Sequence, residues 1–347
     1  MAPRFEVRNL AVELPTSGGW VRPVNDVSFD LAPGESLGIV GESGSGKTIL
    51  SLALMGLEPP GARRTGHALL RAVSHNGASS APEAVDLLAA PPETMRALRG
   101  RQIAMIFQEP MTALNPMMRV GAQIEEMIRV HERGTSKDEL RRRTLDALRR
   151  AAIPEPERRA RQYPHQLSGG LRQRVMIAMS LAAGPGVLIA DEPTTALDVT
   201  VQKQVLDLLS GLRRELNLSL LFITHDLGVI ARIADRVLVM YAGRVVEEGP
   251  TGVILRAPSH PYTQGLLRAA PRLTREKLIP IAGSVPALDR LPRGCAFAPR
   301  CPIHIAECDA GVPELAELEG QAGANGVPHR VRCILAEKAK LETRGSH

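Results

Sequence analysis

The chain has 347 residues, of which 44% are hydrophobic, 23% charged and 3% aromatic. A chain of this length and composition can bury a sizeable core, which excludes a mainly disordered protein. The scarcity of aromatic rings leaves few platforms on which bases of single-stranded nucleic acid could stack. The formal net charge is +6, and eight arginines fall between Arg141 and Arg161. We interpret this run first as a solvated helix face, with anionic lipid and nucleic acid phosphate as the alternatives.

No segment of the sequence predicts secretion or a membrane span. The first ten residues, MAPRFEVRNL, have no apolar core of a secretion signal, so we expect the protein to stay in the cytoplasm. The longest uncharged stretch, Val175 to Ala190, is broken by two glycines and a proline and is too short to cross a bilayer. Any membrane role must therefore come through a partner. The final residues RGSH resemble part of a tag and carry no argument.

Short apolar runs alternate with amphipathic helical stretches from Ser36 to about Val246. Such alternation predicts an α/β fold, with a largely parallel sheet between helices. Nucleotide sites in this architecture lie at the carboxyl ends of the strands. The runs expected to form strands are 37–40, 103–107, 187–190, 218–223 and 236–240.

Changes in composition divide the chain further. Residues 62–92 are rich in Ala, Pro, Gly and Ser, which predicts a surface excursion, and residues 111–182 are mostly helical, which predicts a helical insertion. After about residue 258 the sequence contains prolines, scattered glycines and all four cysteines. We therefore expect a nucleotide-binding domain at 1–257 and a small separate unit at 258–347.

The segment GESGSGKT fits the phosphate-loop pattern, follows an apolar strand and opens the helix TILSLALMGL. Glycines let backbone N–H groups turn towards phosphate oxygens, and the helix adds its positive N-terminal end. Lys47 supplies a charge for the outer phosphates, and the Thr48 hydroxyl can bind Mg²⁺. An ordinary glycine-rich turn is the alternative, but the order strand, loop, lysine and helix argues against it. The predicted ATP-binding residues are Gly41, Glu42, Ser43, Gly44, Ser45, Gly46, Lys47 and Thr48.

Two adjacent carboxylates end the apolar run VLIA, which is expected to deliver them to the carboxyl edge of the sheet. Asp191 suits the Mg²⁺ shell, and Glu192 can polarise the water that attacks the terminal phosphate. Taken alone this pattern is weak, because any strand that meets a helix can produce it. Together with the phosphate loop, it predicts hydrolysis of ATP.

The segment LSGGLRQR, residues 167–174, closely resembles the signature of ABC ATPases, which other phosphate-loop ATPases lack. Ser168 and the two glycines open a helix, so they present N–H groups and a positive helix end. The resemblance implies that this element closes over the ATP of a second subunit, so that hydrolysis needs a dimer. The residues assigned to it are Leu167, Ser168, Gly169, Gly170 and Gln173.

Further positions match the ABC family one by one. By this resemblance, Gln108 senses Mg²⁺, the attacking water and the permease, and His225 contacts the terminal phosphate. Asp198, in the segment ALD at 196–198, belongs to a loop that touches the opposite site across the dimer. Trp20, the single tryptophan, is the candidate aromatic for stacking on adenine, with simple packing as the alternative.

Three segments look like the dipeptide and oligopeptide uptake branch of bacterial ABC ATPases: FQEPMTALNPMMRVGAQI, SHPYTQGLLRAAPRL and GCAFAPRCP. The resemblance runs from about Phe5 to Leu335. It implies a peripheral subunit on the cytoplasmic face of the inner membrane. Its expected partners are a second, different ABC ATPase subunit, two transmembrane permease subunits and an external solute-binding protein, with no nucleic acid.

A soluble ABC ATPase acting on nucleic acid or ribosomes is the alternative of a different class. The basic charge and the cysteine-rich tail favour it. The absence of a long coiled coil between the phosphate loop and the signature, and the few aromatics, argue against it. A kinase that uses the same loop would not explain the signature.

All four cysteines lie near the end of the chain, at Cys295, Cys301, Cys308 and Cys333. A cytoplasmic ATPase rarely keeps structural disulfides, so clustered thiols suggest a metal site. Four thiolates suit tetrahedral Zn²⁺ or a [4Fe–4S] cluster, although the close Cys-x2-Cys pairs of many zinc sites are absent. The resemblance favours the cluster; zinc, and four thiols without a metal, remain the alternatives.

Overall fold

The computed structural model describes residues 2–72, 84–109, 113–132, 134–195, 197–270, 280–318 and 326–336. Part of the predicted surface excursion at 62–92, Ala196 of the segment ALD, and the final RGSH lie outside the described residues. The chain forms two compact units, each built from separate segments. The first contains 1–6, 30–35 and 68–221, and the second contains 7–29, 36–67 and 222–347. Because both units are discontinuous in sequence, the division expected at residue 257 stays a prediction.

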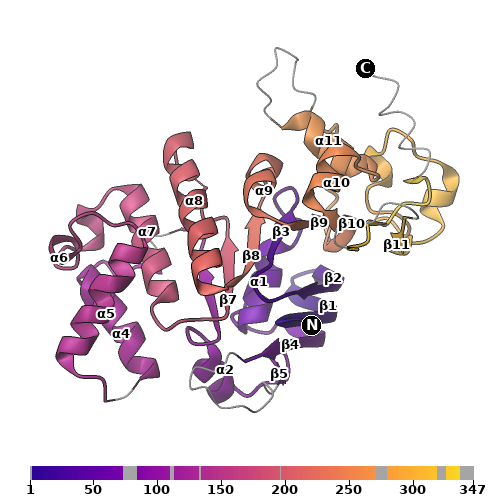
Figure 1. Cartoon of the computed structure of the whole chain (residues 1–347). Coiled ribbons are helices and arrows are strands. Elements are labelled where there is room, and N and C mark those ends of the chain that lie inside the picture. Colours follow the sequence, from indigo (N-terminus) through magenta and orange to yellow (C-terminus); the bar gives the residue numbers. More distant parts are fainter. Residues whose placement is uncertain are drawn as a thin grey trace. The chain divides into compact units, whose positions relative to one another are not determined.

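In the second unit, strand β3 (Ser36–Val40) pairs in parallel with β9 (Arg236–Tyr241). Strand β10 (Arg244–Pro250) continues the sheet antiparallel to β9, and the short strands β12 (Arg330–Val331) and β11 (Ala316–Glu317) follow it. Every residue of β3 and β9 is buried, as expected for parallel strands covered on both faces. The labelled elements can be followed in Figure 1.

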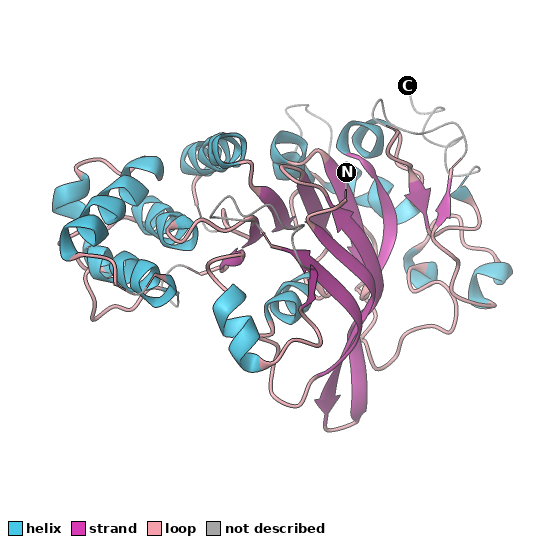
Figure 2. Ribbon diagram, turned by 60° about the horizontal axis from the view of Figure 1, so that its bottom comes forward, coloured by secondary structure: helices cyan, strands magenta, loops and turns pink. Residues whose placement is uncertain are grey.

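The helices of the second unit are α1 (Lys47–Met55), α9 (Leu227–Ile233), α10 (Thr251–Arg256) and α11 (Pro261–Ala269). Two long strands, β1 (Phe5–Thr16) and β2 (Gly19–Leu31), lie next to each other in a separate sheet, and most of their residues belong to this unit. They are the long magenta arrows of Figure 2. Their alternating burial shows that one face of the pair meets the core.

In the first unit, β6 (Ile103–Ile106) pairs in parallel with β7 (Val187–Asp191), with Ile106 opposite Ala190. Strand β4 (Arg63–Arg71) begins in the second unit, and its last three residues pair antiparallel with β5 (Ala84–Asp86) in the first. Helix α2 (Pro92–Leu98) precedes β6, and helix α8 (Val199–Leu216) follows β7. Strand β8 (Ser219–Thr224) spans the boundary of the two units. All five runs predicted to be strands are therefore strands, and the α/β expectation is confirmed.

Residues 120–181 of the first unit are mostly helical. The helices are α4 (Val120–His131), α5 (Lys137–Arg150), α6 (Pro156–Arg159) and α7 (Gly169–Leu181), with a 3₁₀ turn at Pro164–Gln166. Apolar side chains spaced three or four residues apart, such as Ile124, Ile128 and Leu148, bury themselves between α4, α5 and α7. This small core holds the helices together and places the start of α7.

After α11, the described part of the C-terminal region has little regular structure: two 3₁₀ turns, Ala298–Arg300 and Ala306–Asp309, and the strands β11 and β12. A buried polar cluster attaches it to β10. The fully buried carboxylate of Glu247 accepts hydrogen bonds from the backbone N–H of Ser259 at 2.6 Å and of His260 at 3.1 Å. The His329 Nε2 lies 2.7 Å from the same carboxylate. A buried carboxylate with partners on three sides fixes these segments to one another.

Among the described residues, no helix is both long enough and apolar enough to cross a membrane.

Candidate functional site

The phosphate loop connects β3 to α1. At its end, Gly46 has φ 100°, and a Cβ there would lie 1.9 Å from the Pro23 carbonyl oxygen. At its start, a Cβ on Gly41 would lie 2.2 Å from the Met240 carbonyl oxygen. Neighbouring backbone therefore approaches the loop so closely that only glycine fits at both ends. The following helix directs its first N–H groups towards the loop, which suits the binding of phosphate.

The Lys47 ammonium is held at this loop. The side chain is 5% exposed, and Nζ donates to the carbonyl oxygens of Gly41 at 2.7 Å and Glu42 at 3.0 Å. A third contact joins Nζ to the Ser45 hydroxyl at 3.3 Å. Thr48, next along the helix, is exposed. The geometry thus offers one positive charge and one accessible hydroxyl at the start of the same helix.

The two carboxylates follow β7 as expected. Asp191 is the last residue of the strand and is 2% exposed. Glu192 has a left-handed backbone with φ 46°, which is unusual for a residue other than glycine and is found most often at functional sites. Its Oε2 accepts hydrogen bonds from the Thr195 hydroxyl at 2.8 Å and from Gln108 Nε2 at 3.4 Å. The structure thus brings Gln108 and Glu192 together and adds Thr195, which was not predicted.

The signature-like segment begins helix α7. The Ser168 hydroxyl accepts a hydrogen bond from the Leu171 N–H at 3.4 Å, which makes Ser168 the N-cap. Ser168 and Gly169 are exposed, whereas Leu167 and Gln173 are buried. The exposed serine and glycine therefore present the helix N-terminus to solvent, while their buried neighbours fix the helix start.

The remaining family-derived residues lie at element ends. Asp198 is exposed and caps α8, because its Oδ1 accepts from the Val201 N–H at 2.9 Å. His225 is exposed and directly follows β8. Helix capping is thus a structural role that Asp198 has in addition to any contact across a dimer.

Trp20 lies near the start of β2 and is 45% exposed. The guanidinium of Arg63 lies over its indole ring, 3.8 Å from the ring centroid. This cation–π contact covers one face of the ring and leaves the opposite face as the surface on which a base would stack.

Two residues of the C-terminal region contact the phosphate loop, and sequence reasoning did not identify either. The Tyr262 hydroxyl accepts a hydrogen bond from the Glu42 N–H at 2.8 Å. Arg300 forms a two-pronged ion pair with the Glu42 carboxylate, with distances of 2.7 and 3.1 Å. Both residues lie in segments, SHPYT and APRCP, whose sequence resembles the peptide-uptake branch but gave no sign of a contact with the phosphate loop.

An aromatic cluster supports these contacts. The rings of Tyr241, Tyr262 and Phe297 are buried, with centroids 4.6 to 5.4 Å apart. Burial lowers the pKa of the adjacent His260 to about 4, so its imidazole is neutral and Nδ1 accepts from the Tyr262 N–H at 3.0 Å. Burial also raises the pKa of Tyr262, which keeps its hydroxyl protonated. Three of the few aromatic residues of the chain thus gather beside the phosphate loop.

The four cysteines line one small cavity of about 20 Å³, together with apolar side chains such as Phe297 and Ile303. Burial raises the pKa of Cys333 to about 11 and also raises that of Cys295, so both are thiols at neutral pH. A cavity of this size holds about one water molecule. In the described part of the chain, no three His, Cys, Asp or Glu side chains are arranged to hold a metal ion. The metal site predicted for the tail is therefore not confirmed, although all four cysteines line one cavity.

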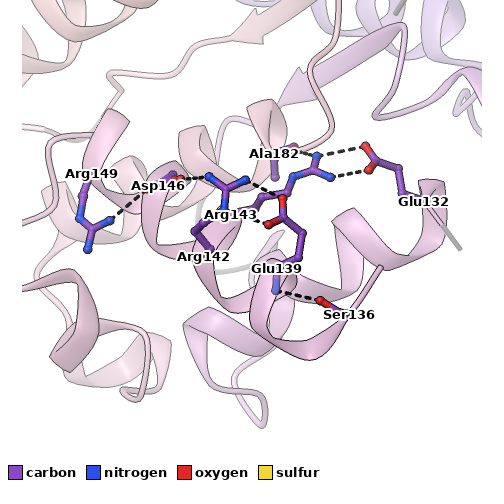
Figure 3. Close-up of polar contacts among 8 residues, drawn as sticks. All are labelled: Glu132, Ser136, Glu139, Arg142, Arg143, Asp146, Arg149 and Ala182. Atoms are coloured by element: carbon purple, nitrogen blue, oxygen red, sulfur yellow. Dashed lines mark hydrogen bonds and ion pairs between the residues drawn. The ribbon is translucent and has the colours of Figure 1, made fainter. Parts of the chain in front are cut away.

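Six of the eight arginines between Arg141 and Arg161 pair with acids close by, and Figure 3 shows three of them, Arg142, Arg143 and Arg149. Arg142 contacts both Glu139 and Asp146 within α5, at 2.6 and 3.1 Å. Arg143 pairs with Glu132, and its Nη2 also donates to the Ala182 carbonyl at 3.4 Å. Further ion pairs in the run are Arg149 with Asp146 and Glu157, Arg150 with Glu215, and Arg158 and Arg159 with Glu155. This pairing supports the solvated helix face and weakens the case for lipid or nucleic acid phosphate.

Comparison with known proteins places the chain in a family. Residues 24–195 match a family described as ABC transporter, and residues 246–308 match one described as oligopeptide/dipeptide transporter, C-terminal region. A protein of Brucella ovis, named for peptide import and ATP binding, is 49% identical over 340 residues, which cover 96% of this chain and 97% of that protein. A protein of Brucella abortus with the same kind of name is 47% identical, covering 92% and 94% of the two chains.

Solved structures agree with this placement. The dimeric ATP-binding cassette MJ0796, bound to ADP and phosphate, aligns with a TM-score of 0.61 and 27% identity over 71% of this chain and 98% of that one. A second structure, cbiO1 from Clostridium perfringens, part of the ABC transporter complex cbiONQ, aligns with a TM-score of 0.58, 27% identity and coverage of 74% and 97%. From its phosphate loop, its paired carboxylates and these matches, the chain belongs to the ABC transporter family, as one of its ATP-binding subunits.

Proposed function

We propose that this chain is the ATP-hydrolysing motor subunit of a transporter that imports dipeptides or oligopeptides through separate permease subunits. The main support for peptide import is the match of residues 246–308 to the C-terminal region of oligopeptide and dipeptide transporters. The names of the Brucella relatives, which describe peptide import, support the same cargo class. A motor of this kind does not itself bind the cargo, so peptide length is set by other subunits.

Hydrolysis is assigned to residues that follow the carboxyl ends of β3, β6, β7 and β8. Lys47 and the N–H groups of the phosphate loop bind the phosphates of ATP. Thr48, Asp191 and Gln108 supply oxygen ligands for Mg²⁺.

Glu192 orients and polarises the attacking water, and His225 contacts the terminal phosphate. The support for this role of Glu192 is local: its left-handed backbone and its contacts with Thr195 and Gln108 fix the direction of one carboxylate oxygen. A pre-oriented carboxylate loses little entropy when it positions water.

The signature segment requires a second subunit. Ser168, Gly169 and the helix behind them are proposed to bind the terminal phosphate of ATP held by a partner ABC ATPase, and Asp198 to contact the opposite site. The exposure of Ser168, Gly169 and Asp198 supports this role. The complete assembly would contain two ATPase subunits, two permease subunits at the inner face of the membrane, and an external solute-binding protein. ATP drives the cycle because it binds the closed dimer more tightly than the open one.

A [4Fe–4S] cluster bound by Cys295, Cys301, Cys308 and Cys333 is a further proposal for the C-terminal region. Its support is that all four cysteines line one apolar cavity. A cluster needs thiolates and more room than one water occupies, so the thiols must ionise and the cavity must widen to hold it. When bound, a cluster would supply covalent cross-links to a region with little core of its own.

Elemental analysis tests this proposal. Protein purified without oxygen is expected to contain iron and acid-labile sulfide in equal amounts. Zinc in their place would identify the tail as a structural zinc site, and the absence of iron, sulfide and zinc would mean four thiols without a metal.

Purification from native membranes tests the transport function. A tagged chain is extracted in mild detergent, and the proteins that remain bound are identified by mass spectrometry. We expect two multi-spanning permeases and a second ABC ATPase. Recovery only with ribosomes or nucleic acid would reject the transport function in favour of a soluble ATPase.

Glu192→Gln tests the chemistry separately. This variant keeps the shape of the side chain but lacks the charge that polarises water, so it is expected to bind ATP, dimerise more stably and hydrolyse very slowly. Turnover close to that of the unmodified protein would remove Glu192 from the mechanism.

A further inference from the structure

Glu42 of the phosphate loop is held by the C-terminal region at two points. Its backbone N–H donates to the Tyr262 hydroxyl at 2.8 Å. Its carboxylate accepts two parallel hydrogen bonds from Arg300, at 2.7 Å from Nη1 and 3.1 Å from Nη2. Tyr262 and Arg300 lie 220 and 258 positions away along the chain. Both the backbone and the side chain of this loop residue therefore depend on distant segments of the same compact unit.

Arg300 is itself held rigidly. Its side chain is 4% exposed, and the Glu42 side chain is 30% exposed. The Arg300 Nε donates to the Ala282 carbonyl at 2.9 Å, and Nη2 also lies 3.4 Å from the Ile281 carbonyl. A third contact joins Nη1 to the Tyr241 hydroxyl at 3.4 Å. A guanidinium fixed by two carbonyls and a hydroxyl presents its remaining donors in one direction, and that direction is Glu42.

Glu42 in turn contacts Lys47, the lysine of the phosphate loop. The Glu42 carbonyl accepts from Lys47 Nζ at 3.0 Å and from the Ser45 N–H at 3.2 Å. A shift of the Glu42 backbone would therefore move an oxygen that holds the lysine ammonium and a turn that shapes the loop. Arg300 is therefore linked to Lys47 by direct hydrogen bonds through a single residue, Glu42.

We propose that Arg300 and Tyr262 are positioning residues for nucleotide binding, through which the C-terminal region holds the phosphate loop in its binding geometry. The region thus acts on the nucleotide site of its own chain, in addition to any role in assembly. Neither residue touches the nucleotide in this proposal; both act through Glu42. The inference rests on nucleotide binding by the loop and is independent of the cargo.

A double-mutant cycle tests the proposal, with MgADP as the probe and titration calorimetry on the full-length chain. Arg300→Ala removes both charge-assisted hydrogen bonds, and Glu42→Gln removes the negative charge and one of the two acceptor oxygens. Each is expected to weaken MgADP binding about tenfold. The double variant is expected to bind about tenfold, rather than a hundredfold, more weakly than the unmodified chain. An arginine that served only to attach the tail would give no such coupling with Glu42.

Two further variants serve as controls. Arg290 lies in the same region, its side chain is 85% exposed, and its guanidinium pairs with the neighbouring Asp289 at 3.9 Å. Arg290→Ala is therefore expected to leave both affinity and melting temperature unchanged. Arg300→Lys keeps the charge but loses the planar fork, so its affinity should lie between those of Arg300→Ala and the unmodified chain. This partial rescue also provides the test if Arg300→Ala does not fold.

Two results would overturn the inference. One is an Arg300→Lys or folded Arg300→Ala chain that binds MgADP as tightly as the unmodified protein. The other is a double variant in which the two single effects multiply. If the unmodified chain itself failed to bind MgADP, the nucleotide-binding function would be wrong instead, so the two failures can be told apart.

Discussion

Gly46→Ala, compared with Gly44→Ala, tests how the phosphate loop is built. Both glycines have a positive φ, 100° at Gly46 and 81° at Gly44. They differ in their surroundings, because a Cβ at Gly46 would lie 1.9 Å from the Pro23 carbonyl oxygen, whereas at Gly44 no heavy atom lies within 4 Å. The pair therefore separates the cost of the backbone conformation from the cost of the steric clash.

The expected loss of folding stability follows from the backbone conformation and the steric clash. A left-handed backbone costs a residue with a Cβ about 1–2 kcal/mol, and this term applies to both variants. The clash at Gly46 forces the backbone around Pro23 to move, and such overpacking costs about 1–3 kcal/mol more. We expect Gly44→Ala to destabilise the chain by about 1–2 kcal/mol and Gly46→Ala by about 2–5 kcal/mol.

Thermal unfolding without nucleotide measures the difference. A loss of 1 kcal/mol lowers the melting temperature of a domain of 150–250 residues by about 2–4 °C. Gly46→Ala should therefore melt at least about 2 °C below Gly44→Ala. Omitting nucleotide matters, because a methyl group at Gly44 could also disturb a bound phosphate. Equal melting temperatures for the two variants would refute the argument that the close approach of Pro23 requires glycine at position 46.

Three other predictions follow from the second compact unit. His329→Ala leaves the buried Glu247 carboxylate without its imidazole partner, so denaturant titration should show a loss of about 3 kcal/mol. The pKa of His260 is lowered to about 4, so an NMR titration should show a neutral ring down to that pH. Its contribution to stability is complete above pH 6.5 and falls by roughly 3 kcal/mol as the pH drops to 4, because only the unfolded chain binds the proton there. Trp20→Ala should weaken ATP binding, and an unchanged dissociation constant would exclude Trp20 from the adenine site.

The strands and the phosphate loop could be predicted because their signals are local. Runs such as VLIA and IAMI form strands that are buried on both faces. A strand of this kind needs consecutive apolar residues, which can be recognised in the sequence. The order of strand, glycine loop, lysine and helix also lies within one short segment. The long strands β1 and β2 were not predicted, because their residues alternate in burial and include turn-forming and charged side chains.

The surroundings of the site residues could not be predicted in the same way. Thr195 lies three positions from Glu192, yet their hydrogen bond depends on the left-handed backbone at Glu192, which no residue preference indicates. For the cysteines, their clustering near the end of the chain suggested a metal site. Their shared cavity, its small volume and the raised pKa of Cys333 depend on how the tail packs.

The sequence by itself determined that this chain is α/β, where its phosphate loop and its two adjacent carboxylates lie, and which family it resembles. These features depend on residues that are close together in the chain, where spacing and chemistry can be interpreted directly. Only the tertiary structure showed that Tyr262 and Arg300 hold Glu42. Those contacts join positions 220 and 258 residues apart, and they exist because the buried aromatic cluster and the Glu247 carboxylate bring the C-terminal region to the loop.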